Sequence, residues 1–293
     1  MPQSTREILR RIKGIKSTQQ ITRAMEMVAA VKLNRVRTLA ENSRPYVNRL
    51  GTLMRIIRSS EMAVAVDHPV FSTKEGSRLL LIVITSDRGL CGTFNINMIN
   101  SVLQFLEEQK GKQVSIIAVG KKGYDTLVRR GYAIEQFFPV PWGSTLASDL
   151  RTINTLLTEG FNAQKIDGVH LYYTQFINVL RHVPTHVKLL PLSPLSEEEK
   201  KHLIKGEIDF IMEPSFQELA LSLIPQYIET QIYHCLIESV TSEQAARMVS
   251  MRNATDNADE MIKNLTLTFN KARQASITRE LIDIIGGVEA MKG

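Results

Sequence analysis

The residues best able to do chemistry lie in two short segments that contain glycine. Thr85–Gly92 reads TSDRGLCG and Gly120–Gly123 reads GKKG, each directly after an apolar run. Neither segment contains the dinucleotide pattern GxGxxG or the phosphate-loop pattern GxxxxGK[ST], so support for nucleotide binding is weak. The alternative is a strand-to-helix turn in which Asp87 caps a helix or pairs with Arg88.

The cysteines and histidines do not form a recognisable catalytic or metal-binding pattern. A nucleophilic cysteine needs a base within reach and a lowered thiol pKa, and the spacing of the six histidines offers Cys91 no base. His182 and His186 are four residues apart, but Pro184 spoils a helical metal pair and no third ligand is evident. Cys91 and Cys235 are too few for a disulfide framework. We expect no catalytic residue, no bound cofactor and no metal.

Basic residues are concentrated at the start of the chain. Residues 1–60 contain 13 Lys and Arg against 3 Asp and Glu, a net charge of +10, whereas the whole chain carries +6. Such a segment can bind nucleic acid, anionic lipid or an acidic protein surface, or be a solvated helix face. No aromatic residue precedes Tyr46 and no helix-turn-helix or zinc pattern is present, which disfavours nucleic acid.

Length and composition restrict the class of protein. The 293 residues are 43% hydrophobic and 23% charged, which supports a packed core. The longest apolar run, Leu79–Ile84, is far shorter than the roughly 20 residues that span a bilayer, and the N-terminus lacks the apolar region of a secretory signal. We expect a soluble protein of a reducing compartment.

The C-terminal part of the chain predicts one very long helix. Gln226–Ile285 contains no glycine and no proline, Ser215 and Glu218 form a capping box, and Gly286-Gly287 supplies the expected end. At 1.5 Å per residue this segment would be about 90 Å long, whereas a compact globule of this size is only about 50 Å across. The sequence therefore predicts a protruding helix. Its expected seam, with steps of three and four, is Met251, Ala254, Ala258, Met261, Leu265, Thr268, Ala272 and Ala275.

The N-terminal part supplies a helix that could pair with it in the antiparallel direction. A capping box at Ser4–Glu7 starts the helix, and Pro45 should kink or break it. Two separate helices folded onto the middle of the chain remain the alternative. The predicted stripe is Ile8, Ile12, Ile15, Gln19, Thr22, Glu26, Ala29, Leu33, Val36, Ala40, Ser43, Val47, Leu50, Met54 and Ile57.

The middle of the chain alternates between strand and helix patterns. This alternation predicts an α/β domain with a mainly parallel sheet covered by helices on both faces. The expected strands are 78–85, 114–119, 132–138, 168–174 and 185–190, and the expected helices are 95–109, 121–130 and 146–162.

Four segments together resemble the gamma subunit of the F-type ATP synthase, bacterial type. Residues 21–33 read ITRAMEMVAAVKL, Thr85–Gly92 reads TSDRGLCG, residues 242–248 read SEQAARM and residues 270–280 read NKARQASITRE. The resemblance covers essentially the whole chain. It implies a non-catalytic central-stalk rotor subunit, whose terminal helices form an antiparallel coiled coil and whose middle domain is Rossmann-like. The resemblance further implies that this shaft couples ion flow to ATP synthesis or hydrolysis by rotating inside a ring of three alpha and three beta subunits.

The resemblance also implies partners and contact residues. The partners would be alpha, beta, epsilon and the c-ring, with delta, a and b in the same complex, no nucleic acid, and an indirect association with the cytoplasmic face of the bacterial inner membrane. ATP, ADP and Mg would be bound by the alpha and beta subunits. Glu213 matches a position facing the rotor foot. The positions matching shaft–ring contacts or helix coupling are Met25, Arg247, Gln274, Thr278 and Glu280.

The expected domain boundaries follow from these elements. They are 1–60 and 214–293 for the shaft helices, 61–76 and 193–213 for linkers, and 77–192 for the α/β domain. Two other functions remain as alternatives: a stand-alone nucleotide-binding enzyme built on the middle domain, and a coiled-coil protein that binds nucleic acid.

Overall fold

The computed structural model describes residues 5–59, 70, 76–141, 143–192 and 215–290. The chain divides into two compact units. The first contains Met1–Ala30 and Arg247–Gly293, and we call its described part, residues 5–30 and 247–290, the helix pair. The second contains Val31–Ala246, and we call it the α/β unit.

The α/β unit contains one five-stranded sheet with the order β3-β2-β1-β4-β5. The pairs β1/β2, β1/β4 and β2/β3 are parallel, whereas β4/β5 is antiparallel. The mainly parallel sheet that the alternating pattern predicted is therefore present. The strands are β1 Arg78–Ile84, β2 Gln113–Val119, β3 Ile134–Phe138, β4 Gly168–Phe176 and β5 His182–Leu190.

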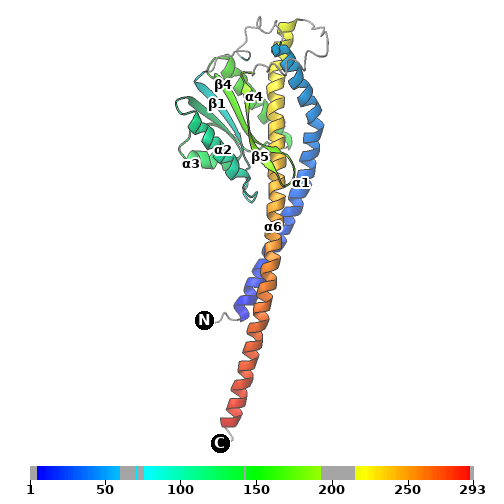
Figure 1. The fold of residues 1–293 in the computed structure, drawn as a ribbon, viewed down its shortest axis with the longest axis vertical. Coiled ribbons are helices and arrows are strands. Elements are labelled where there is room, and N and C mark those ends of the chain that lie inside the picture. Colours follow the sequence, from blue (N-terminus) through cyan, green and yellow to red (C-terminus); the bar gives the residue numbers. More distant parts are fainter. Residues whose placement is uncertain (1–4, 60–69, 71–75, 142, 193–214, 291–293) are drawn as a thin grey trace. The chain divides into compact units, whose positions relative to one another are not determined.

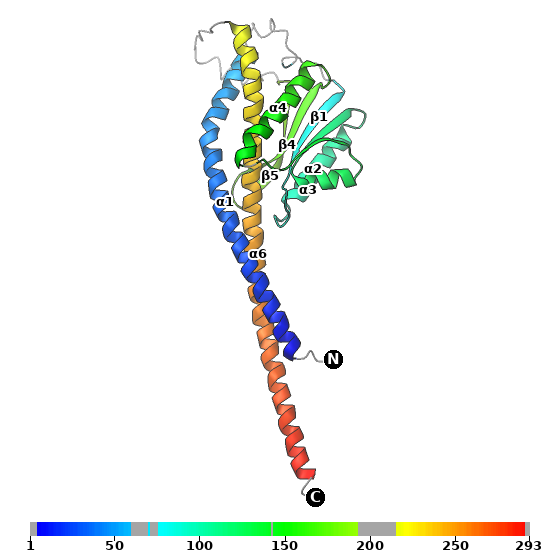
Figure 2. The same cartoon turned by 180° about the vertical axis from the view of Figure 1, so that it is seen from behind.

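Helices cover both faces of this sheet (Figures 1 and 2). Helices α2 (Phe94–Glu108) and α3 (Lys121–Arg129) pack on one face, where Met98, Val102 and Leu127 are buried. Helix α4 (Leu146–Asn162) packs on the other face together with parts of the two terminal helices. The continuous apolar pattern of β1 follows from this arrangement, because a strand buried on both faces has no solvent side.

Helix α1 runs from Thr5 to Ser59 without interruption, so of the two outcomes predicted for Pro45, a kink or a break, the break was wrong. The helix continues because proline removes one hydrogen bond, while the buried side chains of Val47 and Leu50 still hold the next turns in place. The predicted stripe is confirmed: every member is buried or half-buried. The Ser4 half of the predicted capping box lies outside the described residues.

Helix α6 runs from Phe216 to Ala290. Ser215 starts it as predicted, since its Oγ accepts a hydrogen bond of 3.2 Å from the amide of Glu218. The predicted end at Gly286-Gly287 was wrong, because both residues are helical. A glycine costs a helix only about 1 kcal/mol relative to alanine, so it weakens a helix without ending it.

The remaining differences from the predicted elements are small. Strand β5 begins at His182 rather than residue 185 and includes Pro184, which an edge strand tolerates because its outer side needs no donor. Strand β4 continues to Phe176, whereas β3 begins only at Ile134. The predicted linkers 61–76 and 193–213 lie almost entirely outside the described residues.

Candidate functional site

The two helices of the helix pair contact each other through polar side chains at their centre. Gln19 donates a hydrogen bond of 2.5 Å to Oδ1 of Asp259, and the hydroxyls of Thr22 and Thr255 are 2.8 Å apart. On α1, Thr22 follows Gln19, whereas on α6 its partner Thr255 precedes Asp259, the partner of Gln19. The two helices therefore run in opposite directions. Thr22 and Thr255 are both buried, which makes this hydroxyl pair part of the contact surface.

The predicted seam of α6 was correct at five of its eight positions. Met251 and Ala258 are buried, and Ala254, Leu265 and Ala272 are half-buried. Met261, in contrast, is 56% exposed, and Thr268 and Ala275 are also exposed. At these places the residue that follows the predicted one is the less exposed, as with Ile262 after Met261 and Phe269 after Thr268. The less exposed alternates, all buried or half-buried, are Thr255, Ile262, Phe269 and Ser276.

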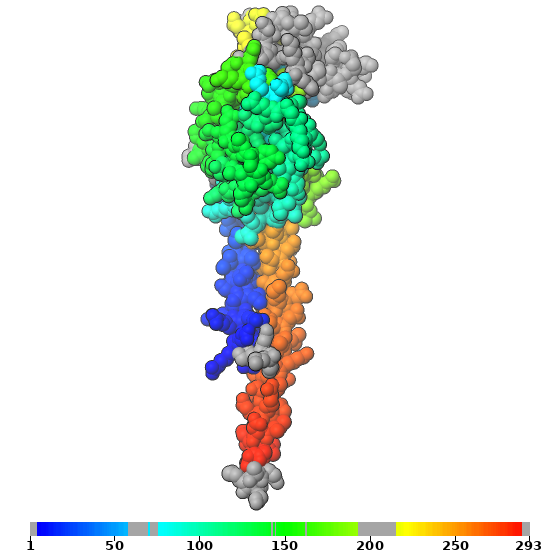
Figure 3. Space-filling view, turned by 90° about the vertical axis from the view of Figure 1, so that its left-hand side faces the viewer, coloured from blue at the N-terminus to red at the C-terminus, as the bar shows by residue number. Residues whose placement is uncertain are grey.

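The last turns of α6 expose a broad apolar surface. Extending the register of the Thr22–Thr255 pair places the start of α1 near Ala272, and Figure 3 shows the red end of α6 with no other described segment beside it. Leu281 is 55% exposed and Ile285 is 65% exposed. An isolated helix of this length is marginally stable in water, so this surface needs a partner from outside the described chain. The exposed residues are Ile277, Leu281, Ile282, Ile284, Ile285 and Val288.

The part of the helix pair that precedes these turns also exposes large apolar side chains. They alternate with basic side chains that are exposed as well, including Arg10, Lys13 and Arg23. An apolar surface edged by positive charge is typical of a protein interface rather than of a solvated helix. The exposed apolar residues are Leu9, Ile21, Met27, Val28, Met261 and Leu267.

The residues expected to contact partners lie at different places in the helix pair. Met25 and Arg247 are half-buried beside the seam. Gln274, Thr278 and Glu280 are exposed on the last turns of α6. The Thr278 hydroxyl donates to the backbone oxygen of Gln274 at 3.0 Å, a local bond within the helix. Glu213 lies outside the described residues.

The segment Thr85–Gly92 forms a closed turn at the carboxyl end of β1. Both carboxylate oxygens of Asp87 are occupied, since they accept 3.0 Å hydrogen bonds from the amides of Lys121 and Val140. Gly120, at φ 97°, lies so close to the Thr85 backbone that a Cβ would collide with its carbonyl oxygen. The amide at the start of α3, where a phosphate could bind, therefore already serves an internal carboxylate. This geometry supports the capping alternative for Asp87.

Cys91 lies in the same turn and packs rather than reacts. Its side chain is buried against Phe94 and Ala246, and its Sγ lies 3.2 Å from Nδ2 of Asn95 and 3.7 Å from the hydroxyl of Ser86. Neither neighbour can act as the base that a thiol nucleophile requires. The sequence interpretation of Cys91 as a packing residue agrees with this environment.

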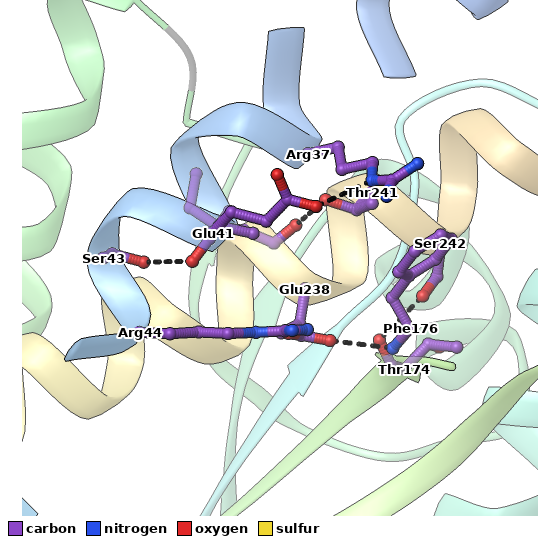
Figure 4. Close-up of polar contacts among 11 residues, drawn as sticks. Arg37, Glu41, Ser43, Arg44, Thr174, Phe176, Glu238, Thr241 and Ser242 are labelled. Carbon is purple, nitrogen blue, oxygen red and sulfur yellow. Dashed lines mark hydrogen bonds and ion pairs between the residues drawn. The ribbon is translucent and has the colours of Figure 1, made fainter. Parts of the chain in front are cut away.

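A buried carboxylate joins three elements at one end of the α/β unit, which Figure 4 shows in close-up. Glu238 on α6 is 3% exposed, and its Oε1 accepts a hydrogen bond of 3.0 Å from Arg44 on α1. Its Oε2 accepts one of 2.9 Å from the amide of Phe176, at the end of β4. A nearby hollow of about 120 Å³ is lined by these residues and by Arg37 and Glu41. The arrangement fastens α1 and α6 to the sheet.

Two functional classes find no support in the described part of the chain. Within it, no helix is long and apolar enough to cross a membrane. No group of three or more His, Cys, Asp or Glu side chains there could hold a metal ion.

Comparison with known proteins identifies the family. The family model described as ATP synthase matches residues 4–291. The ATP synthase gamma chain of Pelotomaculum thermopropionicum is 41% identical over 289 residues, covering 99% of both chains, and that of Alkaliphilus metalliredigens is 41% identical over 287 residues, covering 98% of both.

Solved structures agree with this result. A chain of the Tetrahymena thermophila mitochondrial ATP synthase central stalk and c-ring is similar with a TM-score of 0.62 and 26% identity, covering 80% of this chain and 99% of that chain. A chain of the Euglena gracilis mitochondrial ATP synthase matches with a TM-score of 0.64 at 20% identity, covering 98% and 94%, which supports the fold. The chain therefore belongs to the family of ATP synthase gamma chains, the non-catalytic central-stalk subunits of F1.

Proposed function

We propose that this chain is the turning shaft of a rotary ATP synthase, working by changing its contacts with a surrounding ring rather than by chemistry of its own. The single observation that carries the proposal is the uncovered apolar surface at the end of α6. A surface that the chain does not cover itself can bind differently to different conformations of a partner. Differential binding of this kind shifts a partner between open and closed states.

In this proposal the helix pair is an antiparallel coiled coil. The alternating steps of the seam and the opposite directions of the two helices support a coiled coil. The α/β unit is Rossmann-like in the sense that the strand order β3-β2-β1-β4-β5 resembles that of doubly wound nucleotide-binding folds, with its last strand reversed. The domain boundaries at 60, 76, 192 and 213 belong to the same proposal.

The partners follow from the same reasoning. Three alpha and three beta subunits would surround the helix pair and hold ATP, ADP and Mg. The epsilon subunit and the c-ring would contact the chain at Glu213. Delta, a and b would belong to the same complex, which would lie at the cytoplasmic face of a bacterial membrane and contact it only through the c-ring. We propose Met25, Arg247, Gln274, Thr278 and Glu280 as contacts or coupling positions toward the ring.

The charge of α1 supports an acidic protein surface as the partner rather than nucleic acid. The exposed basic side chains alternate with exposed apolar ones such as Ile21 and Val28, and no aromatic side chain for stacking on bases precedes Tyr46. Salt should weaken but not abolish binding, because burial of apolar surface contributes alongside charge.

Reconstitution of the whole ATP synthase complex into vesicles tests the proposal. The variant carries Leu281→Ser, Ile282→Ser and Ile285→Ser on the exposed turns, and the matched control carries Lys263→Ser and Asn264→Ser, which are exposed and polar. We expect the apolar variant to lower coupled ATP synthesis in vesicles at least about tenfold, with the isolated chain equally stable. Equal coupling in variant and control would contradict the shaft role. Micromolar nucleotide binding by the chain alone would favour the enzyme alternative instead.

A further inference from the structure

Two histidines that no sequence pattern connected meet on the outer strand pair of the α/β unit. Nδ1 of His170 on β4 and Nε2 of His186 on β5 are 2.8 Å apart. Their ring centroids are 5.0 Å apart and the ring planes differ by 18°. The centroid separation is close to the nitrogen separation plus two ring radii, so the rings meet edge to edge in nearly one plane. This is the geometry of a hydrogen bond in which one nitrogen carries a proton and the other accepts it.

Aromatic side chains contact both rings of the pair. The ring centroid of Phe105 on α2 is 5.1 Å from that of His170 and 5.2 Å from that of His186. The Tyr172 ring lies 4.9 Å from His186, its partner in the strand register. His170 is half-buried, whereas His186 is exposed. The pair therefore connects β4, β5 and α2, and it is the one side-chain hydrogen bond recorded between β4 and β5 in the described residues.

The charged groups around the two rings differ. Lys112, after α2, and Lys188, on β5, both oppose a positive charge on His170, as does His186 itself. Glu108 at the end of α2 favours a positive charge on His186 and opposes ionisation of Tyr172. A first proton therefore binds His186, whose Nε2–H then donates to neutral His170. A second proton would leave the pair without an acceptor and bring two positive rings into contact.

We propose that the hydrogen bond between His170 and His186 holds β5 against β4 and α2 as long as the pair carries at most one proton. When the pair carries two protons, this edge of the sheet opens. We call the pair the fastening of the sheet edge. The device lies wholly within the α/β unit and does not depend on the rotor role. It would make local opening of this edge sensitive to acidification, while the contact between α1 and α6 stays unaffected.

The direction of the effect follows from the protonation equilibria. Burial, followed by the charges of His186, Lys188 and Lys112, lowers the pKa of His170 from 6.5 to about 4. Burial also lowers the pKa of His186, although Glu108 partly opposes it. The opened state binds protons more readily than the closed one, so the fastening is fully present above pH 6.5 and weakens as the pH falls toward 4.

Hydrogen exchange of the full chain tests this inference. Protection factors, which are corrected for the intrinsic exchange rate, are compared at pH 7 and pH 4.5 for β5 and, as an internal reference, for β1. We expect protection of β5 to fall at least about tenfold more than protection of β1. In the His186→Gln variant, whose amide keeps a donor and an acceptor but cannot titrate, the extra loss should become smaller, because His170 still titrates but no longer faces a second positive ring. An equal loss in the native chain and the variant would overturn the proposal.

Nitrogen NMR of the imidazoles gives a second test that needs no variant. At pH 6 we expect Nδ1 of His170 to be unprotonated and hydrogen-bonded, with the ring staying neutral until well below pH 5. The proposal would be wrong if His170 gained its proton near pH 6.5 with β5 still fully protected.

Discussion

The α/β unit and the helix pair differ in what covers their apolar side chains. In the α/β unit the sheet is covered on both faces, and residues such as Ile82, Leu157 and Leu171 are completely buried. In the helix pair the seam is narrow, and many large apolar side chains remain exposed. The α/β unit is stabilised by apolar side chains that it buries itself. The helix pair, in contrast, has an apolar surface that no described residue covers. The two regions therefore differ in how completely the described residues cover their apolar side chains.

Removing core volume from the α/β unit should give the largest effect on stability. Leu157 on α4 is 0% exposed, and replacing such a leucine by alanine costs about 3–4 kcal/mol through lost burial and the remaining cavity. Urea unfolding can be followed by tyrosine circular dichroism, because all seven tyrosines lie in residues 31–246. The matched substitution Leu281→Ala in the helix pair should change the free energy of unfolding by less than about 0.5 kcal/mol. If Leu157→Ala and Leu281→Ala lowered the free energy of unfolding by similar amounts, the two regions would not differ in how their apolar side chains contribute to stability.

Breaking the buried ion pair should have the next largest effect. Arg44→Ala leaves the Glu238 carboxylate buried with the Phe176 amide as its remaining recorded partner, and we expect a loss of about 2–3 kcal/mol in the same unfolding assay. The value is below that of a fully buried pair because Arg44 is 49% exposed.

The control for this pair is Glu238→Gln. It keeps the acceptor for the Phe176 amide and removes the charge, so it should cost less than Arg44→Ala. The opposite order would show that the charge itself, rather than its compensation, stabilises this corner of the α/β unit.

The hydroxyl pair at the centre of the helix pair should give a smaller effect. Thr255→Val removes the contact with Thr22 but keeps the shape, at a cost of about 1 kcal/mol. The remaining Thr22 hydroxyl still donates to the backbone oxygen of Gln19, which limits the loss. Hydrogen exchange of amides in the helix pair would measure the change. The double variant with Thr22→Val should cost less than the sum of the two single variants, and strict additivity would argue against a direct contact in solution.

The smallest effect is expected at the surface pair of Glu7 and Arg11. Their side chains are 2.9 Å apart, and both are about half exposed. Glu7→Gln should therefore change helix stability by less than about 0.5 kcal/mol, and added salt should remove the difference. Thermal unfolding at low and high salt would measure it. A larger loss that persists at high salt would mean that Glu7 has a role beyond this pair.

The sequence predicted those features that depend on local periodicity. The stripe of α1 was correct along its whole length because buried and exposed residues alternate there without ambiguity. The seam of α6 was ambiguous because Met261 and Ile262 are adjacent and both apolar, and only contact with α1 selects Ile262. The His170–His186 pair could not be predicted, since it depends on the register between β4 and β5 and on a shift in that register between Val169 and His170.

The carboxylate of Asp87 also has a consequence for how this fold could change its function. It is bound at the first turn of α3, and a helix N-terminus is a kind of position at which proteins commonly bind a phosphate. The Asp87 carboxylate thus occupies the backbone amide of Lys121 that a phosphate would otherwise bind. A protein of this fold that binds a nucleotide at this amide would first have to replace Asp87. This one side chain therefore separates the present non-catalytic subunit from a nucleotide-binding relative.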